Sequence, residues 1–137
     1  RLAVPMLRRS QDASIINLAS VAGRLGYAFR TPYAASKWAV VGFTQSLAKE
    51  LGPEGIRVNA LLPGIVRGER IERVFRDRAQ TLGTSVEAVR ETYLGKVSLR
   101  RMVEPDDMAA MALFLCSPMG RNISGQALSI CGNVETL

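Results

Sequence analysis

The stretch NLASVAGRLGYAFRTPYAASK, residues 17–37, contains three polar side chains whose spacing points to chemistry. Tyr33 and Lys37 are four residues apart at the start of an expected helix, and Ser20 precedes the tyrosine by thirteen residues. A step of four residues is just over one helical turn, so Tyr33 and Lys37 share one face of that helix. We therefore expect the serine, the tyrosine and the lysine to form one site.

These side chains suit the movement of a proton on and off an oxygen atom. A phenol has a pKa of about 10 and is a poor base at neutral pH. A fixed ammonium beside the phenol stabilises the phenolate, and a serine hydroxyl can hydrogen-bond the substrate oxygen. The three residues therefore predict general acid–base chemistry at an alcohol or carbonyl oxygen.

Strand-like and helix-like segments alternate on either side of this stretch. Two apolar runs, residues 14–19 and 56–62, are typical of buried parallel strands. A further strand is expected over residues 126–130, near the end of the chain. Helical patterns cover residues 32–51, 69–80, 85–94 and 105–116, and residues 1–9 look like the end of another helix. The alternation predicts an α/β fold with right-handed crossovers and a doubly wound parallel sheet.

In a doubly wound sheet, ligands bind beyond the carboxyl ends of the strands. Ser20 and the pair Pro63-Gly64 directly follow expected strands, and Tyr33 and Lys37 open an expected helix. All of these residues are therefore expected along the same edge of the sheet.

Four segments together resemble the C-terminal half of a classical short-chain dehydrogenase/reductase. They are SIINLAS (14–20), TPYAASK (31–37), VNALLPG (58–64) and ISGQ (123–126). The resemblance implies that residues 1–137 are the C-terminal part of one Rossmann-type NAD(P)-binding domain whose nucleotide-binding half is absent. It also implies an oxidoreductase that interconverts a secondary alcohol and a ketone, with NAD or NADP as its cofactor and a small molecule as its substrate.

The resemblance implies a role for each matching position. Ser20 matches the serine that polarises the substrate oxygen, Tyr33 the tyrosine that transfers the proton, and Lys37 the lysine that activates the tyrosine and holds the nicotinamide ribose. Cofactor contacts are also expected from the turn Pro63-Gly64, against the nicotinamide, and from the backbone of Val66, next to the nicotinamide amide.

The sequence departs from the family pattern at several places. The glycine-rich G-x-x-x-G-x-G element is absent, and Gly68 stands where a threonine is usual. The last strand ends in Cys131-Gly132-Asn133 instead of Asp-Gly-Gly. Because the chain begins at Arg1 without a phosphate-binding turn, we expect a fragment that by itself binds NAD(H) and NADP(H) negligibly and is aggregated or molten.

Two further expectations concern partners. Residues 65–101 resemble the family's substrate lid and are rich in arginine. An anionic substrate held by Arg67 or Arg70 is one interpretation, and solvated helix faces are the interpretation that we favour. The helix over residues 32–51 is apolar on more than one side, which indicates a homodimer or homotetramer.

Composition excludes several classes of protein. The 137 residues contain no histidine, which excludes a Ser-His-Asp triad and a plausible zinc site. The net charge of +6 comes from scattered residues without interleaved aromatics, so no nucleic-acid partner is expected. No apolar run reaches the roughly 18 residues of a membrane span. Cys116 and Cys131 are expected to be reduced core side chains, as in a cytoplasmic protein.

Two alternatives remain open at this stage. The chain could be a catalytically silent fragment or oligomerisation module of such an enzyme. A sugar-nucleotide epimerase or dehydratase also carries Tyr-x-x-x-Lys, but it has a larger C-terminal substrate domain than the roughly one hundred residues that follow Tyr33 here.

Overall fold

The structure, a computed structural model, describes residues 2–134 and 137. Three parallel strands form a sheet in the order β1–β2–β3: β1 is Ser14–Leu18, β2 is Arg57–Pro63 and β3 is Ala127–Ile130. Ser14 lies opposite Arg57 in the first pairing. The expected α/β class with a parallel sheet is confirmed.

Helices occupy the segments between and beyond the strands. The α-helices of the described residues are α1 (Val4–Leu7), α2 (Thr31–Leu51), α3 (Glu69–Leu82), α4 (Val86–Gly95) and α5 (Pro105–Cys116). Short 3₁₀ turns are η1 (Val21–Gly23), η2 (Gly52–Glu54) and η3 (Pro118–Gly120).

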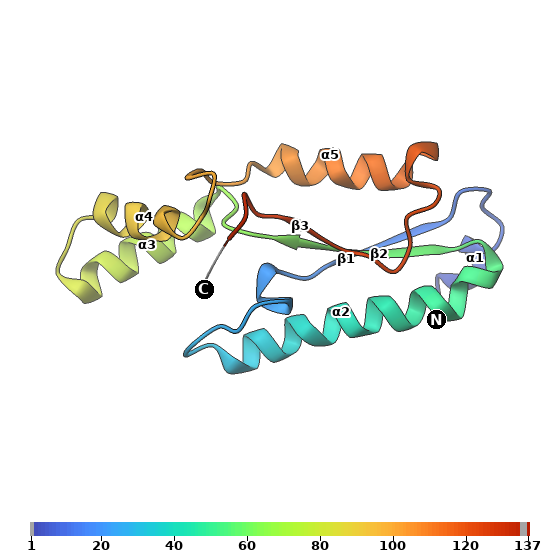
Figure 1. The fold of residues 1–137 in the computed structure, drawn as a ribbon, viewed down its shortest axis with the longest axis horizontal. Helices are drawn as coiled ribbons and strands as arrows, with labels where there is room; N and C mark the ends of the chain where they lie inside the picture. Colours follow the sequence, from blue (N-terminus) through green and yellow to red (C-terminus); the bar gives the residue numbers. More distant parts are fainter. Residues whose placement is uncertain (1, 135–136) are drawn as a thin grey trace.

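The elements form three layers, with the sheet between α2 on one face and α5 on the other (Figure 1). Ala48 and Leu51 of α2 pack with Ile56 and Val58 at the amino end of β2. Nearer the carboxyl end, a second cluster of α2 and strand residues comprises Ala19, Val40, Val41, Ala60, Leu62 and Ala127. The apolar residues that repeat along α2 therefore fix this helix along the length of the sheet.

A polar contact also sets the position of α2. The buried Thr44 hydroxyl donates to the Val40 carbonyl at 2.7 Å and accepts a hydrogen bond from the Asn17 side chain at 2.9 Å. Asn17 lies on β1, so the middle of α2 is tied to that strand. Since a buried polar group costs free energy when it is unpaired, this contact favours one register of helix on strand.

Helices α3 and α4 form a unit beyond the carboxyl ends of the strands (Figure 1). We call residues 69–95 the α3–α4 unit. It has a small core of its own, in which Phe75 is fully buried and meets Tyr93 edge-on, with 5.3 Å between the ring centroids. This core explains the apolar stripe of the amphipathic α3 sequence.

Several expected boundaries differ from those observed. The helix expected over 1–9 is a single turn, Val4–Leu7, and Arg1 lies outside the described residues. The helix expected to end at Gln80 continues to Leu82. Cys116, expected in the core, is exposed at the end of α5, whereas Cys131 is half-buried. Helix ends and single exposed positions depend on neighbours that local sequence does not reveal.

The described residues include a strand at a sheet edge, and they include no helix suited to a membrane. β1 lies at one edge of the sheet, with β2 as its neighbour on one side only. No helix in the described ranges combines the length and apolar character needed to cross a bilayer.

Candidate active site

The end of β1 positions Ser20. The parallel ladder continues one residue beyond β1, where the Ala19 amide donates to the Leu61 carbonyl at 2.9 Å. Ser20 then caps η1, its hydroxyl oxygen accepting a hydrogen bond from the Ala22 amide at 3.2 Å. The hydroxyl keeps its own proton for donation and lies half-buried at the carboxyl end of the sheet.

The first turns of α2 carry Tyr33 and Lys37, both half-buried. The Lys37 ammonium nitrogen lies 5.7 Å from the centroid of the Tyr33 ring and donates to the Leu18 carbonyl at 3.4 Å. Lys37 therefore links the tyrosine to the end of β1, two residues before Ser20. Within the described part of the chain, no hydrogen bond joins Ser20 directly to Tyr33.

Close packing sets the distance between the serine turn and α2. A Cβ atom on Gly23 would lie 2.7 Å from the Lys37 carbonyl oxygen and 3.1 Å from Cγ2 of Val41. Only a glycine therefore allows η1 to approach the helix this closely. The position of Ser20 relative to Lys37 thus depends on a residue that carries no chemistry of its own.

Arg24 holds the other side of the same turn. Its guanidinium donates to the Ala127 carbonyl at 2.6 Å and to the Ser129 hydroxyl at 3.2 Å. Both acceptors lie on β3. Gly23 therefore packs the turn against α2, and Arg24, the next residue, bonds it to the edge of the sheet. Our sequence analysis missed Gly23 and Arg24, although a glycine three residues after the serine was a visible signal.

The aromatic ring of Tyr27 lies against the ring of Tyr33. The two centroids are 6.3 Å apart and the planes meet at 78°, an edge-to-face arrangement that aromatic pairs favour. The Arg30 guanidinium lies 5.6 Å from the Tyr27 centroid. Tyr27 therefore lies between a cation and the candidate proton-transfer residue, a role that spacing alone did not suggest.

Pro63 and Gly64 lie where β2 meets the end of β3. Pro63 is the last residue of β2, and the Gly64 amide donates to the Ile130 carbonyl at 3.0 Å. A Cβ atom on Gly64 would lie 2.8 Å from Cα of Cys131. This turn is therefore at the carboxyl edge of the sheet, and its glycine is required by the close passage of β3.

Val66 forms a parallel bridge with Val103. The bridge uses the Ile65 carbonyl, which accepts from Val103, and the Arg67 amide, which donates to Val103, both at 2.8 Å. In this pattern the amide and carbonyl of Val66 itself point away from the bridge. Those groups are therefore oriented toward a different partner.

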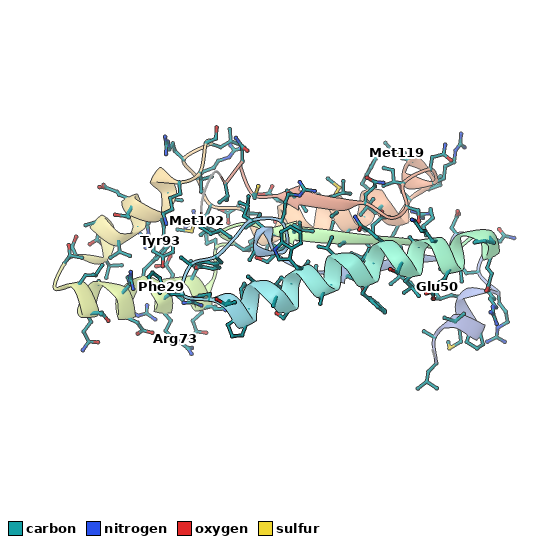
Figure 2. All side chains as sticks on the ribbon, turned by 60° about the horizontal axis from the view of Figure 1, so that its bottom comes forward. Phe29, Glu50, Arg73, Tyr93, Met102 and Met119 are labelled. Carbon is teal, nitrogen blue, oxygen red and sulfur yellow. The ribbon has the colours of Figure 1, made fainter. Side chains whose placement is uncertain are left out.

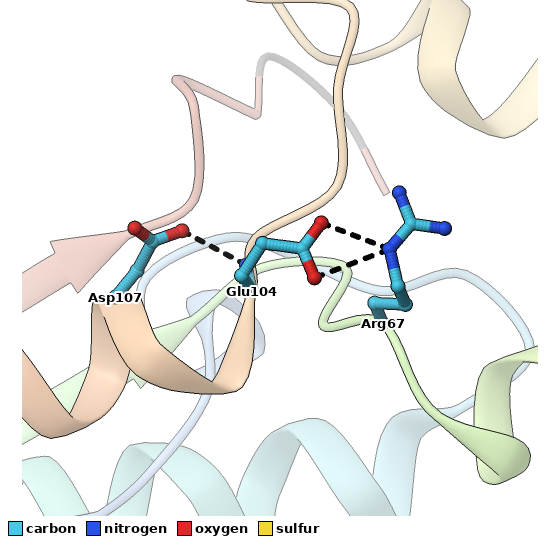
Figure 3. Close-up of polar contacts among 3 residues, drawn as sticks. All are labelled: Arg67, Glu104 and Asp107. Carbon is cyan, nitrogen blue, oxygen red and sulfur yellow. Dashed lines mark hydrogen bonds and ion pairs between the residues drawn. The ribbon is translucent and has the colours of Figure 1, made fainter.

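An ion pair fastens the two ends of the segment that carries the α3–α4 unit. The Arg67 guanidinium donates to the Glu104 carboxylate at 2.8 Å, and the Glu104 amide donates to the Asp107 carboxylate at 2.8 Å (Figure 3). The hydrogen bond that Arg67 donates to the Glu104 carboxylate, together with the negative charge of that carboxylate, raises the pKa of Arg67. The charge of Arg67 is thus already met by a carboxylate of the same chain.

Asn59, the asparagine of the segment VNALLPG, holds two parts of the chain together. It is fully buried on β2, where its amide group donates to the Ile123 carbonyl at 2.8 Å and its oxygen accepts from the Gln126 amide at 3.0 Å. The segment ISGQ is therefore held against β2 by one side chain. The segments VNALLPG and ISGQ, which are far apart in the sequence, are therefore hydrogen-bonded to each other in the fold.

Comparisons with known proteins find relatives along nearly the whole chain. The family model described as enoyl-(acyl carrier protein) reductase matches residues 1–132. A putative ketoacyl reductase of monensin polyketide synthase from Streptomyces virginiae is 39% identical over 128 residues, which are 93% of this chain and 49% of the relative. The 3-oxoacyl-(acyl-carrier-protein) reductase of Thermotoga maritima is 35% identical over 134 residues, 98% of this chain and 50% of the relative.

A solved structure shares the fold. The actinorhodin polyketide ketoreductase with NADPH superposes with a TM-score of 0.83 and 35% identity, covering 90% of this chain and 48% of that one. The chain therefore spans about half the length of the relatives it matches. With a family model matched over nearly all of its residues, the chain belongs to the short-chain dehydrogenase/reductase family.

Proposed function

We propose that this chain supplies the proton-transfer half of an NAD(P)-dependent oxidoreductase that interconverts a secondary alcohol and a ketone. The observation that carries the proposal is the position of Lys37, 5.7 Å from the Tyr33 ring and hydrogen-bonded at the end of the strand that leads to Ser20. The relatives named as ketoacyl reductases support the same reaction class.

Each residue has a distinct task. The Ser20 hydroxyl donates a hydrogen bond to the substrate oxygen and fixes its place beside Tyr33. The Tyr33 hydroxyl gives its proton to that oxygen during reduction and takes one from it during oxidation. The Lys37 ammonium stabilises the phenolate that is left on Tyr33 after the proton has moved.

The residues at the strand ends fit the nicotinamide end of a cofactor. The backbone groups of Val66 point away from the bridge with Val103, and Pro63 and Gly64 lie at the end of β2 on the same edge, with Gly64 packed against Cys131. NAD or NADP would supply the hydride acceptor or donor. Val66 would hold the carboxamide, Pro63-Gly64 would support the ring, and Lys37 would hold the ribose hydroxyls.

We infer that the phosphate-binding half of the sheet comes from outside residues 1–137. β1 has one free edge among the described residues, and the relatives are about twice as long as the chain. By themselves the 137 residues are then catalytically silent. A titration of residues 1–137 with NADH and NADPH, followed by nicotinamide fluorescence, should detect no binding. Dinucleotide binding at micromolar affinity by a folded monomer would contradict this assignment.

The outer face of α2 suits a second copy of the protein. Trp38 and Phe43 are more than half exposed, and their neighbours on this face are small and uncharged. An exposed apolar face of this kind marks an interaction site. We therefore keep a cytoplasmic homodimer or homotetramer as part of the proposal, to be checked by light scattering of the full-length protein.

The reaction itself is tested with two matched variants of the full-length protein. Tyr33→Phe removes the proton carrier and should lower kcat by at least ~10²-fold, with cofactor binding retained. Tyr93→Phe removes a hydroxyl from the core of the α3–α4 unit and should leave kcat within about twofold. Turnover is followed by the nicotinamide absorbance with a panel of ketones. A Tyr33→Phe variant with near-normal turnover would refute the assignment.

A further inference from the structure

The loop between η1 and α2 contains a tight turn that is strained. The Arg30 amide donates to the Tyr27 carbonyl at 3.2 Å and closes the turn, whose third residue, Phe29, has a φ of 60°. A bulky residue is rarely found in this left-handed region, where glycine is usual. Backbone strain that persists beside a candidate active site points to a function of the geometry it enforces.

The geometry enforced by this turn brings Arg30 back over Tyr27. The guanidinium lies 5.6 Å from the Tyr27 centroid, within the range of a cation–π contact. The same Tyr27 ring makes the edge-to-face contact with Tyr33. Arg30 is therefore held near Tyr33 through one intervening ring, although its own side chain is exposed.

Arg30 belongs to the arginines that have no carboxylate partner among the described residues. Ion pairs engage Arg67 with Glu104, Arg73 with Glu69 and Arg90 with Glu72. Over residues 2–134 and 137, no carboxylate lies within ion-pair distance of Arg30. A guanidinium that is held in place but has no anion beside it can accept one from a substrate.

The loop faces the space beyond the strand ends. Phe29 lies at the end of the molecule that also carries Tyr93 and Arg73 of the α3–α4 unit (Figure 2). A substrate that reaches Tyr33 from this end would pass the Arg30 side chain. Because a guanidinium matches a carboxylate with two parallel hydrogen bonds, Arg30 is suited to recognise that group.

We propose that Arg30 is a specificity-determining residue that binds a carboxylate of the substrate, so that the protein acts on a keto acid and the corresponding hydroxy acid. The inference rests on the proposed function, because it names the substrate class of that site. It replaces Arg67, whose charge is met by Glu104, as the residue that recognises an anion; Arg70, the other arginine named from the sequence, has no ion pair among the described residues and stays the alternative.

The test compares charged and neutral substrates of equal size with the full-length protein. The probes are straight-chain 3-oxo acids of four to eight carbons and their methyl esters, with NADH and NADPH offered separately. The variants are Arg30→Gln, which removes the charge, and Arg30→Lys, which keeps it. Arg121→Gln is the matched control, because Arg121 follows η3 at the end of α5 remote from the α3–α4 unit (Figure 1).

The expected result is a change in preference and not a general loss of activity. Arg30→Gln should lower kcat/KM for the best acid about 10- to 100-fold, as expected for a hydrogen-bonded charge pair, mainly through KM. The value for the ester should change less than about threefold. Arg30→Lys should recover part of the loss, and Arg121→Gln should match the unmodified protein.

The remaining outcomes separate the two proposals. Turnover of esters with no preference for acids, or an equal loss for both in Arg30→Gln, would overturn the carboxylate assignment and leave the proposed function standing. Absence of turnover with every acid and ester would overturn the carboxylate assignment as stated. If Tyr33→Phe also left the turnover of other ketones unchanged, the proposed function would fail separately.

Discussion

Replacement of Gly23 by alanine tests whether close packing positions Ser20, the serine of the candidate active site. The new Cβ would lie 2.7 Å from the Lys37 carbonyl oxygen, whereas ordinary contacts begin near 3.4 Å. Since the obstacle is helix backbone, η1 and α2 must separate by about 0.7 Å, the difference between these two distances. We expect a loss of stability of about 1–3 kcal/mol, as for other overpacked sites.

The same displacement acts on catalysis, because Ser20 caps η1 and Lys37 supplies the carbonyl that is pushed away. A misplacement approaching 1 Å can cost about 10²-fold in rate, so we expect kcat to fall about 10- to 100-fold. Cofactor affinity should change little. The measurements are steady-state kinetics, a cofactor titration and urea unfolding of the full-length protein.

Gly26 offers the matched control in the same loop. A Cβ atom there would meet nothing within 4 Å, so Gly26→Ala should keep kcat and be neutral or slightly stabilising. If Gly23→Ala behaved like Gly26→Ala in both kcat and stability, the packing argument would be wrong.

Three further predictions concern the frame of the site and one of its distant ion pairs. Asn59→Leu should lower the free energy of unfolding by about 2–4 kcal/mol, because the buried backbone groups of Ile123 and Gln126 lose their partner; a urea midpoint equal to that of the unmodified protein would count against this. Gly64→Ala should destabilise the protein by crowding Cys131, while Gly52→Ala, which meets nothing within 4 Å, serves as its control in the same thermal melt. The hydrogen bond from Arg8 lowers the pKa of Glu54, so its contribution is present above the unfolded-state pKa and is lost as the pH falls through the folded-state pKa. Glu54→Gln should therefore be less stable than the unmodified protein at neutral pH, and the difference should disappear as the pH falls through the folded-state pKa of Glu54; a difference that did not shrink in acid would contradict the linkage.

The sequence predicted the features that depend on local pattern. Buried strands appear as short apolar runs, and β2 is buried along almost its whole length, as the run over residues 56–62 indicated. The helical pattern expected over residues 85–94 is observed as α4, which Ser85 caps by accepting a hydrogen bond from the Ala88 amide at 3.1 Å. The helical spacing of Tyr33 and Lys37 correctly placed their side chains together.

The sequence did not predict contacts between elements that are far apart in the chain. Glu72 pairs with Arg90 of α4 at 2.7 Å, although Arg76 lies four residues away on its own helix. The packing of α4 against α3 brings this competing cation within reach, and spacing within α3 carries no information about it. The contacts of Gly23 and Arg24 with α2 and β3 were missed for the same reason. The roles of all the expected site residues stay predictions: Ser20, Tyr33, Lys37, Pro63, Gly64 and Val66.

The bridge between Val66 and Val103 has a consequence for protein engineering. The polypeptide leaves the sheet and returns to it at two residues that are already hydrogen-bonded neighbours, with the ion pair of Arg67 and Glu104 directly beside them. Everything between these residues can therefore be exchanged as a cassette, because the graft points are fixed by the host scaffold. A segment of different length from another member of the family, joined at these positions, would change the surface beyond the strand ends without moving a strand. Chimeras cut at this bridge should fold more often than chimeras cut inside α3, where the Phe75 core would be divided.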